Sequence, residues 1–271
     1  MNLEANVFFR SRLWDGRKHY LDKMTLGDLG RAYMAYPAIR AYALLAVVSA
    51  VVVVALWDGR PLGVAAAMAL AVLAYPLVWY LLHRYVLHGR YLYKNARTAP
   101  LWKRVHYDHH QDPNDLGVLF GALYTTLPTI AAVTLPIGWL LAGPVGAAAA
   151  FGTGMAVTCA YEFCHCIQHL AYAPKSRFIS RIKKLHLMHH YHNEQGNFGI
   201  TNFLWDRLLG TFYGDSQAIP RSATNFNLGY DEAEGERYPW VKALSTRPGA
   251  PDNSPDNSPG DSLGSDARGG D

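Results

Sequence analysis

Charged residues are absent from three long stretches of the chain. No Asp, Glu, Lys or Arg occurs in Ala41–Trp57, Leu62–Leu82 or Leu116–Tyr161. Soluble domains intersperse charge along their helices, whereas runs of about 20 uncharged, mostly apolar residues are typical of helices that cross a membrane. Twenty-one residues at about 1.5 Å each span about 30 Å, the thickness of a bilayer's hydrocarbon core. The pattern therefore predicts an all-α integral membrane protein rather than a soluble helical domain.

Turn signals divide the three apolar stretches into four predicted spans. The sequence DGRP between the first two stretches is typical of a turn. The third stretch is too long for one span, and the sequence AGPVG at Ala142–Gly146 is its natural break. We therefore expect helices near Val118–Leu141 and Val145–Tyr161 after the first two, which makes four transmembrane helices.

Lysine and arginine predict the orientation of these spans. Seven occur in the first forty residues, six lie between the second and third spans, and five more follow the fourth span between residues 175 and 184. The two turns on the other side carry one at most. By the positive-inside rule, both ends of the chain and the middle loop face the cytoplasm.

Composition adds a domain division and excludes one class of partner. The net charge of +4 is accounted for by orientation and by attraction to anionic head groups, and no basic module with interleaved aromatic residues indicates a nucleic-acid partner. We expect a cytoplasmic N-terminal segment over residues 1–40 and a membrane domain with a cytoplasmic cap over residues 41–245. Residues 246–271, rich in Pro, Gly, Asp and Ser, are predicted to be a disordered tail.

Ten of the twelve histidines fall into four groups with helical spacing. On a helix, positions i and i+4 differ in direction by about 40° and positions i and i+3 by about 60° the other way, so both share one face. One group is different: His83 and His88, five apart, would diverge by about 140° on a regular helix. Either they serve two different centres or the helix loosens there. The other groups are His106, His109 and His110; His165 and His169; and His186, His189 and His190.

The predicted topology brings all four groups to one side of the membrane. Each group lies at, or soon after, the cytoplasmic end of the second or fourth span. Several imidazoles at one place cannot all be protonated, and neutral imidazole is a strong ligand for first-row transition metals. One ion takes about four to six ligands, so ten histidines indicate two ions. We therefore predict a helical, histidine-rich cytoplasmic cap that holds a dimetal site.

The order of the motifs HxxxxH, HxxHH, HxxxH and HxxHH resembles the fatty acid hydroxylase/sterol desaturase superfamily of integral-membrane diiron oxygenases, and its fatty acid 2-hydroxylase branch most closely. Three longer stretches resemble this superfamily too: HHQDPND at His109–Asp115, YEFCHCIQH at Tyr161–His169, and the ending His189–Phe212 with its WD pair. The resemblance implies that the ten grouped histidines are the metal ligands, and that no further side chain is needed as nucleophile or general base. It implies two Fe ions (with zinc possible after purification), O₂ as co-substrate, a membrane lipid as substrate, and a separate electron donor such as cytochrome b5 or a ferredoxin.

Other functions remain open at this point. Desaturation, or oxidation of a sterol or carotenoid, would use the same diiron chemistry as hydroxylation of an acyl chain. A membrane zinc hydrolase is a different class, but the chain has no HExxH motif. A metal transporter would place ionisable residues inside the spans, whereas these spans lack them.

Several further residues are candidates for supporting the site. Glu162, Asp108, His192 and Asn193 lie close in sequence to the histidine groups, and each could hold a ligand ring by a hydrogen bond or have a surface or capping role instead. The ending Asn197–Asp206 is expected to frame the site. The aromatic-rich stretch Tyr75–Tyr85 is expected to pack helices rather than to line a substrate tunnel.

Overall fold

The structure is a computed structural model that describes residues 19–245. The basic positions before residue 19 and the predicted disordered tail lie outside the described residues. The regular secondary structure of the described residues is helical, apart from one isolated bridge between Tyr20 and Asp115, and loops join the helices. The expectation of an all-α protein is confirmed for this part of the chain.

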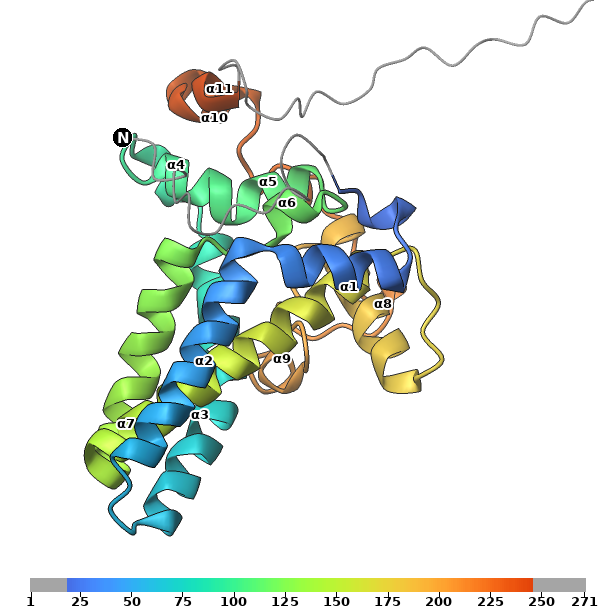
Figure 1. Ribbon diagram of the computed structural model, residues 1–271. Coiled ribbons are helices and arrows are strands. Elements are labelled where there is room, and N and C mark those ends of the chain that lie inside the picture. The colour runs from blue at the N-terminus through green and yellow to red at the C-terminus, as the bar shows by residue number, and fades with distance from the viewer. Residues whose placement is uncertain (1–18, 246–271) are drawn as a thin grey trace, which may run out of the picture.

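Three long apolar helices form one bundle: α2 (Pro37–Ala55), α3 (Pro61–Leu81) and α7 (Leu123–His169) (Figure 1). They belong to the three described helical stretches that are long and apolar enough to cross a membrane. Pro37 and Pro61 each occupy the first turn of their helix, where the missing N–H costs no hydrogen bond. The chain is therefore a membrane protein by the length and composition of its helices.

Helix α7 contains a sharp reversal at Ala142–Gly143, within the predicted break. Gly143 has φ +61°, a conformation that glycine adopts without steric penalty. On either side, Gly138 and Gly146 approach so closely that a Cβ on one would clash with the backbone of the other. Figure 1 shows the two arms of α7, residues 123–141 and 144–169, running in opposite directions beside α2 and α3.

The predicted start of the third helix at Val118 is wrong. The short helix α6 (Leu116–Leu119) ends first, and Phe120 and Ala122 have extended backbone before α7 begins at Leu123. The intervening Gly121 donates its N–H to Oε1 of Glu162 at 3.3 Å, and a Cβ there would lie 2.6 Å from Oγ1 of Thr126. Close approach of the backbone to the second arm of α7 therefore interrupts the helix. That second arm also continues past the predicted end at Tyr161, as far as His169.

Shorter elements form a cap at one end of the bundle, with α10 and α11 at the end of the molecule opposite the α2–α3 turn (Figure 1). Aromatic side chains of Tyr93, Trp102 and Tyr230 pack together in one of its cores. The elements are η3 (Leu82–Leu87), η4 (Leu92–Lys94), α4 (Ala99–Trp102), η5 (Lys103–Tyr107), α5 (Asp108–Gln111), α8 (Arg177–Tyr191), α9 (Leu204–Leu208), η6 (Ser216–Ala218), α10 (Glu232–Arg237) and α11 (Trp240–Ser245).

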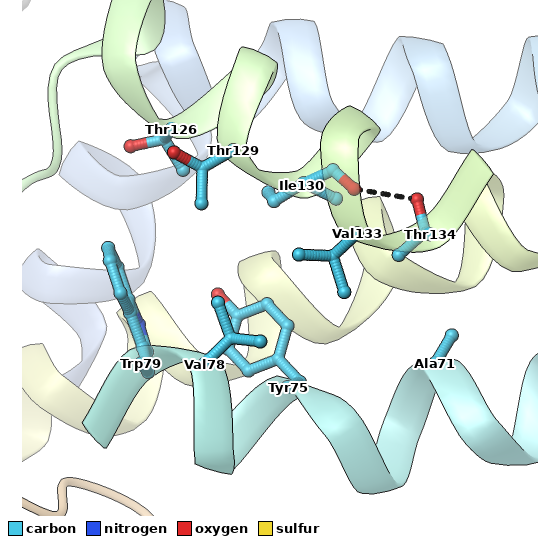
Figure 2. A pocket seen from close by; sticks show the side chains of 9 residues that line it. All are labelled: Ala71, Tyr75, Val78, Trp79, Thr126, Thr129, Ile130, Val133 and Thr134. Atoms are coloured by element: carbon cyan, nitrogen blue, oxygen red, sulfur yellow. Dashed lines mark hydrogen bonds between the residues drawn. The ribbon is translucent and has the colours of Figure 1, made fainter. Parts of the chain in front are cut away.

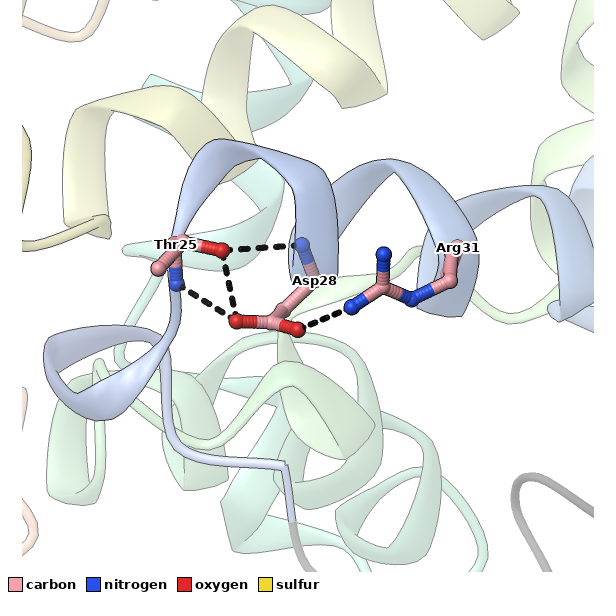
Figure 3. Close-up of polar contacts among 3 residues, drawn as sticks. All are labelled: Thr25, Asp28 and Arg31. Carbon is pink, nitrogen blue, oxygen red and sulfur yellow. Dashed lines mark hydrogen bonds and ion pairs between the residues drawn. The ribbon is translucent and has the colours of Figure 1, made fainter.

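The N-terminal helix α1 (Leu26–Ala35) follows η2 (Leu21–Lys23) and begins with a capping box (Figure 3). Thr25 Oγ1 accepts the N–H of Asp28 at 3.2 Å, while the Asp28 carboxylate accepts the N–H of Thr25 at 3.0 Å and pairs with Arg31. The box satisfies two backbone donors that a helix start leaves unpaired. The opposite face of α1 buries Leu29 and Tyr33 in the same core as Leu116 and Phe120. Helix α1 is thereby fixed to the segment that links the cap to α7.

Candidate metal centre

The ten grouped histidines come together in two sets of five. In each set, one ring nitrogen from every histidine lies within 4.8 Å of the others. Metal–imidazole bonds of about 2.0–2.1 Å place opposite ligands about 4.2 Å apart, so each set is compact enough to surround one ion. Group A is His83, His88, His106, His110 and His189, and group B is His109, His165, His169, His186 and His190.

Each HxxHH motif divides between the two groups in the same way. The pair at i and i+4 enters one group, and the remaining histidine enters the other. His106 and His110 belong to group A while His109 belongs to group B. In the last motif the two groups are exchanged: the i, i+4 pair belongs to group B, and His189 belongs to group A. A helix presents i and i+4 on one face, and the i+3 position is turned toward the neighbouring centre.

His83 and His88 belong to one group because the helix changes its winding between them. Residues Leu82–Leu87 form a π-helix, and the N–H of His88 donates to the carbonyl of His83, five residues earlier, at 3.1 Å. The two ring centroids are 4.9 Å apart. Of the two alternatives that the spacing left open, the loosened helix is the one observed.

The two groups are immediate neighbours. The ring centroids of His110 in group A and His190 in group B are 4.3 Å apart, and those of His189 and His190 are 5.3 Å apart. Both groups border one cavity of about 480 Å³, counting its open mouth, to which His83 and His106 contribute from group A and His109, His165 and His186 from group B. A molecule in this cavity would face both groups at once.

Burial keeps the imidazoles neutral. Several grouped histidines lie outside the three long apolar helices, and desolvation is the main reason why their pKa values are lower than usual. For His110 and His189 it lowers the pKa to about 3. Neighbouring imidazoles oppose protonation further. Neutral rings offer the lone pairs that metal ions require. The same direction applies to His88, His106, His109, His186 and His190.

Backbone carbonyls orient three rings of group A. The Nδ1 atoms of His83, His110 and His189 lie 2.6, 2.8 and 2.8 Å from carbonyl oxygens and can each donate a hydrogen bond there. This contact fixes the tautomer and leaves Nε2 as the free lone pair, an arrangement common among metal-binding histidines. The three carbonyls belong to Phe198, Asn225 and Gly196 respectively.

The remaining ring nitrogens fit a metal better than they fit one another. The Nε2 atoms of His110 and His189 are buried without a hydrogen-bond partner among the described residues, and so are both ring nitrogens of His109 and His190. Elsewhere Nε2 atoms crowd together: His88 and His106 at 2.8 Å, His169 and His186 at 2.9 Å. Buried polar atoms without partners are costly, and an ion in each group would satisfy one nitrogen of every ring. The donor sets therefore fit two metal ions.

The four other candidates from the sequence lie at different places. Glu162 is buried on the wall of the cavity, and its described hydrogen bond is the one from Gly121. Asp108 pairs with Lys103, and both are buried. His192 Nε2 lies 2.8 Å from the carbonyl of Ile219, and the Asn193 amide donates to the carbonyl of Pro220 at 2.8 Å. No described hydrogen bond joins any of the four to a grouped histidine.

Asp206 frames the site through the turn that carries Phe198. Its carboxylate accepts the N–H groups of Phe198 and Gly199 at 2.7 and 2.9 Å, and the hydroxyl of Thr211 at 2.8 Å. This fixes the peptide whose carbonyl meets His83. The ending Asn197–Asp206 thus acts as the frame that the sequence led us to expect.

Two functional contacts were missed by the sequence reasoning. Asn225 faces His110 through its carbonyl and donates its side-chain amide to the carbonyl of His190 at 3.1 Å, so it touches both groups. Asn225 lies far along the chain from any motif, and no local pattern marks it. Glu194 is fully buried and accepts the Thr224 hydroxyl at 2.6 Å. It lies four residues after the last motif, and this proximity was the signal that could have found it.

Comparisons with known proteins identify the family of this chain. The family model for fatty acid hydroxylase matches residues 68–211, about half of the chain. Dihydroceramide fatty acyl 2-hydroxylase FAH2 of Arabidopsis thaliana is 33% identical over 159 residues, which cover 57% of this chain and 64% of that protein. Ceramide very long chain fatty acid hydroxylase SCS7 of Saccharomyces cerevisiae is 30% identical over 157 residues, covering 55% of this chain and 38% of that one.

A solved structure gives the same picture. The chain resembles full-length Scs7p, of which only the hydroxylase domain is visible, with a TM-score of 0.58 and 27% identity over 70% of this chain and 69% of that one. The matches to the curated relatives above span between about two fifths and two thirds of their length. The family match covers most of α3, both arms of α7 and every grouped histidine, so this chain belongs to the fatty acid hydroxylase family.

Proposed function

We propose that this protein is a membrane-bound diiron oxygenase that hydroxylates a C–H bond of a lipid acyl chain. The reaction takes one O₂, two electrons and two protons, places one oxygen atom in the C–H bond and releases the other as water. The observation that carries the proposal is the pair of adjacent five-histidine groups on one cavity. The relatives it matches are named as fatty acyl and ceramide hydroxylases, which supports an acyl chain as substrate.

The ten grouped histidines are proposed as the ligands of two Fe ions. Nitrogen donors suit first-row transition metals, and zinc could replace iron during purification. When bound, the two ions supply O₂ activation and the oxidising power that breaks a C–H bond. The protein's own residues hold the rings neutral, orient three of them through backbone carbonyls, and place the substrate carbon in a cavity walled by Trp79, Tyr161 and Glu162.

The proposed topology has four crossings, with the cap and both termini in the cytoplasm. The two antiparallel arms of α7 support counting that helix as two spans, since each arm is about as long as α2 or α3. The lysines and arginines near the cap support the orientation. Electrons would come from a separate donor of the cytochrome b5 or ferredoxin kind.

Hydroxylation is favoured over the alternatives by specific observations. Desaturation or oxidation of a sterol or carotenoid would use the same centre, but the curated relatives named above are hydroxylases of acyl chains. A hydrolytic zinc site keeps three protein ligands and an open position, whereas each group here offers five nitrogen donors.

The test is a metal and oxygen measurement on the purified protein, followed by lipid analysis. We expect about two iron ions per chain, O₂ uptake that depends on added acyl lipid and a reductant, and a product heavier by one oxygen atom. A product lacking two hydrogens would indicate desaturation. Hydrolysis with zinc alone, and no O₂ uptake after reloading with iron, would refute the proposal.

A further inference from the structure

An apolar groove runs through the membrane bundle beside the metal centre. It lies between α3 and the first arm of α7, whose side chains face each other across it (Figure 2). Its volume is about 380 Å³, including the part open to the outside. The lining residues are Ala71, Tyr75, Val78 and Trp79 from α3, and Thr126, Thr129, Ile130, Val133 and Thr134 from α7.

The groove borders the histidine cavity. Trp79 lines both spaces, and Thr126 of the groove lies against Gly121, which lines the cavity. On α3, Ala71, Tyr75, Trp79 and His83 follow one another at four-residue intervals, so the face that lines the groove leads to a ligand of group A. The distance from Ala71 to His83 along the helix is about 18 Å.

Aromatic rings form the wall where groove and cavity meet. The ring centroids of Tyr75 and Tyr161 are 5.3 Å apart, and those of Trp79 and Tyr161 are 5.6 Å apart. The sequence led us to expect that Tyr75–Tyr85 packs helices rather than lining a tunnel. Tyr75 and Trp79 do pack against Tyr161 of α7, and together with Val78 they also line the groove.

Two of the threonine hydroxyls along the groove are already satisfied within their own helix, and the buried lining atom without a described partner is Nε1 of Trp79, where the groove meets the cavity. The hydroxyl of Thr129 donates to the carbonyl of Thr125 at 2.8 Å. The hydroxyl of Thr134 donates to the carbonyl of Ile130, also four residues earlier and at 2.8 Å (Figure 2). The groove therefore makes little demand for hydrogen bonds, and an apolar occupant suits it. The half-buried Val78, Thr129 and Val133 leave it partly open to the surroundings of the bundle, which are lipid in a membrane.

We propose that this groove binds the hydrocarbon tail of the substrate and that its far end selects chain length. The proposal rests on the proposed lipid hydroxylase function and names the part of the protein that limits the length of the substrate's hydrocarbon tail. The tail enters between α3 and the first arm of α7, passes Trp79, and leaves the carbon to be oxidised beside the histidines. Ala71, Val133 and Thr134 lie at the end remote from the cavity, where a longer chain would meet them.

The first experiment fills the far end of the groove. Val133→Phe adds a ring there. The control, Ala132→Phe, adds the same ring at the preceding position, which is exposed and does not line the groove. One methylene more or less in a hydrophobic pocket changes discrimination by about tenfold or more. For Val133→Phe we expect the ratio of long-chain to short-chain product to fall by about tenfold, with Ala132→Phe matching the unmodified protein. Equal chain-length profiles for both variants would overturn the proposal.

The second experiment does not depend on turnover or on a variant that folds. A fatty acid carrying a diazirine near its methyl end is photolysed with the unmodified protein in lipid nanodiscs, and the labelled peptide is identified by mass spectrometry. Labelling of residues 129–134 or of Ala71–Tyr75, suppressed by excess long-chain fatty acid, supports the groove even if no hydroxylated product forms. Labelling confined to exposed lipid-facing positions such as Val54 or Leu140 would overturn it. Labelling in the groove without any product would count against the proposed function alone.

Discussion

Groups A and B contain the same number of imidazoles but are supported in different ways. Four members of group B lie on the long regular helices α7 and α8, at i and i+4 in each. In group A, His83 and His106 lie on π-helical turns, and His88 caps the first of these turns. Three rings of group A rest on backbone carbonyls, whereas the Nδ1 atoms of His109, His169, His186 and His190 have no such partner among the described residues.

This difference indicates that the imidazole rings of one group can be brought to a common point in two ways. A regular helix aims i and i+4 at one point without further help. An irregular backbone does not, and His83 on its π-turn rests on the carbonyl of Phe198. His110 on α5 and His189 on α8 rest on carbonyls too, so all three partners of group A, Gly196, Phe198 and Asn225, lie in the segment after α8. Group A should therefore depend on that segment more than group B, which the Asn225 amide contacts only at the backbone carbonyl of His190.

The largest expected effect comes from removing one ring from each group in turn. His110→Ala takes a ligand from group A and His109→Ala takes one from group B, at adjacent positions. Since even residues that only support ligands contribute about 10–100-fold, we expect each variant to lose more than about 100-fold in turnover. Metal analysis should find about one ion per chain instead of two, while the protein still inserts into membranes. His19→Ala, outside both groups, serves as the control; normal turnover in either ligand variant would contradict the assignment.

Asp206→Ala should separate the two groups. It removes the acceptor for the N–H groups of Phe198 and Gly199, and so frees the carbonyl that meets His83. We expect the metal affinity of group A to fall by about 10–100-fold while group B keeps its ion. Competition with a chelator, followed by metal analysis, measures the two affinities.

Asp206→Asn is the matched control, because it keeps one acceptor oxygen and the size of the side chain. It should lie between Asp206→Ala and the unmodified protein. Equal loss of both ions in Asp206→Ala would mean that the frame supports the whole fold rather than one group.

A smaller effect is expected at Glu162, which lies on the cavity wall without a described hydrogen bond to any ring. Its Oε1 accepts the N–H of Gly121, and Glu162→Gln preserves an oxygen at that place. Because a single hydrogen bond contributes about 1 kcal/mol and this one is retained, turnover should change by less than about threefold. Glu162→Ala tests the hydrogen bond itself. A loss of a hundredfold in Glu162→Gln would indicate that the charge of the carboxylate acts on group B.

The smallest effect is expected for a variant that lowers the stability of the protein and leaves the metal content of both groups unchanged. Thr25→Ala removes the capping box of α1, which is exposed and distant in sequence from the motifs. Loss of such a cap costs about 1 kcal/mol, which lowers the melting temperature of a domain of this size by about 2–4 °C. Thermal unfolding in detergent measures this, and metal content should stay unchanged. Loss of one ion in Thr25→Ala would show that α1 takes part in the centre.

The sequence predicted the features that depend on local spacing. Charge-free stretches located α2, α3 and both arms of α7, and helical periodicity placed His165 with His169 and His186 with His190. These predictions succeed because side-chain direction on a regular helix follows from residue number alone.

Features that depend on distant contacts could not be predicted in this way. The π-turn that brings His83 to His88 appears in the sequence only as an unusual interval, and spacing alone left two explanations. The carbonyl of Asn225 reaches His110 from 115 residues away, through a backbone atom that every residue possesses. Similarly, Asn193 and His192 lie next to a motif, yet their side chains turn toward Pro220 and Ile219. Sequence proximity identified candidates, but packing decided their roles.

Two dipeptides, His109–His110 and His189–His190, each place one ring in group A and the other ring in group B. Neighbouring Cα atoms are about 3.8 Å apart across a rigid peptide plane, so the backbone positions that carry the two groups are tied together twice by covalent geometry. A displacement of the backbone at either dipeptide therefore moves one ring of each group. Any motion of α5 or α8 during turnover must then move the pair in unison, and the backbone itself serves as the spacer that a bridging carboxylate provides in other dinuclear proteins.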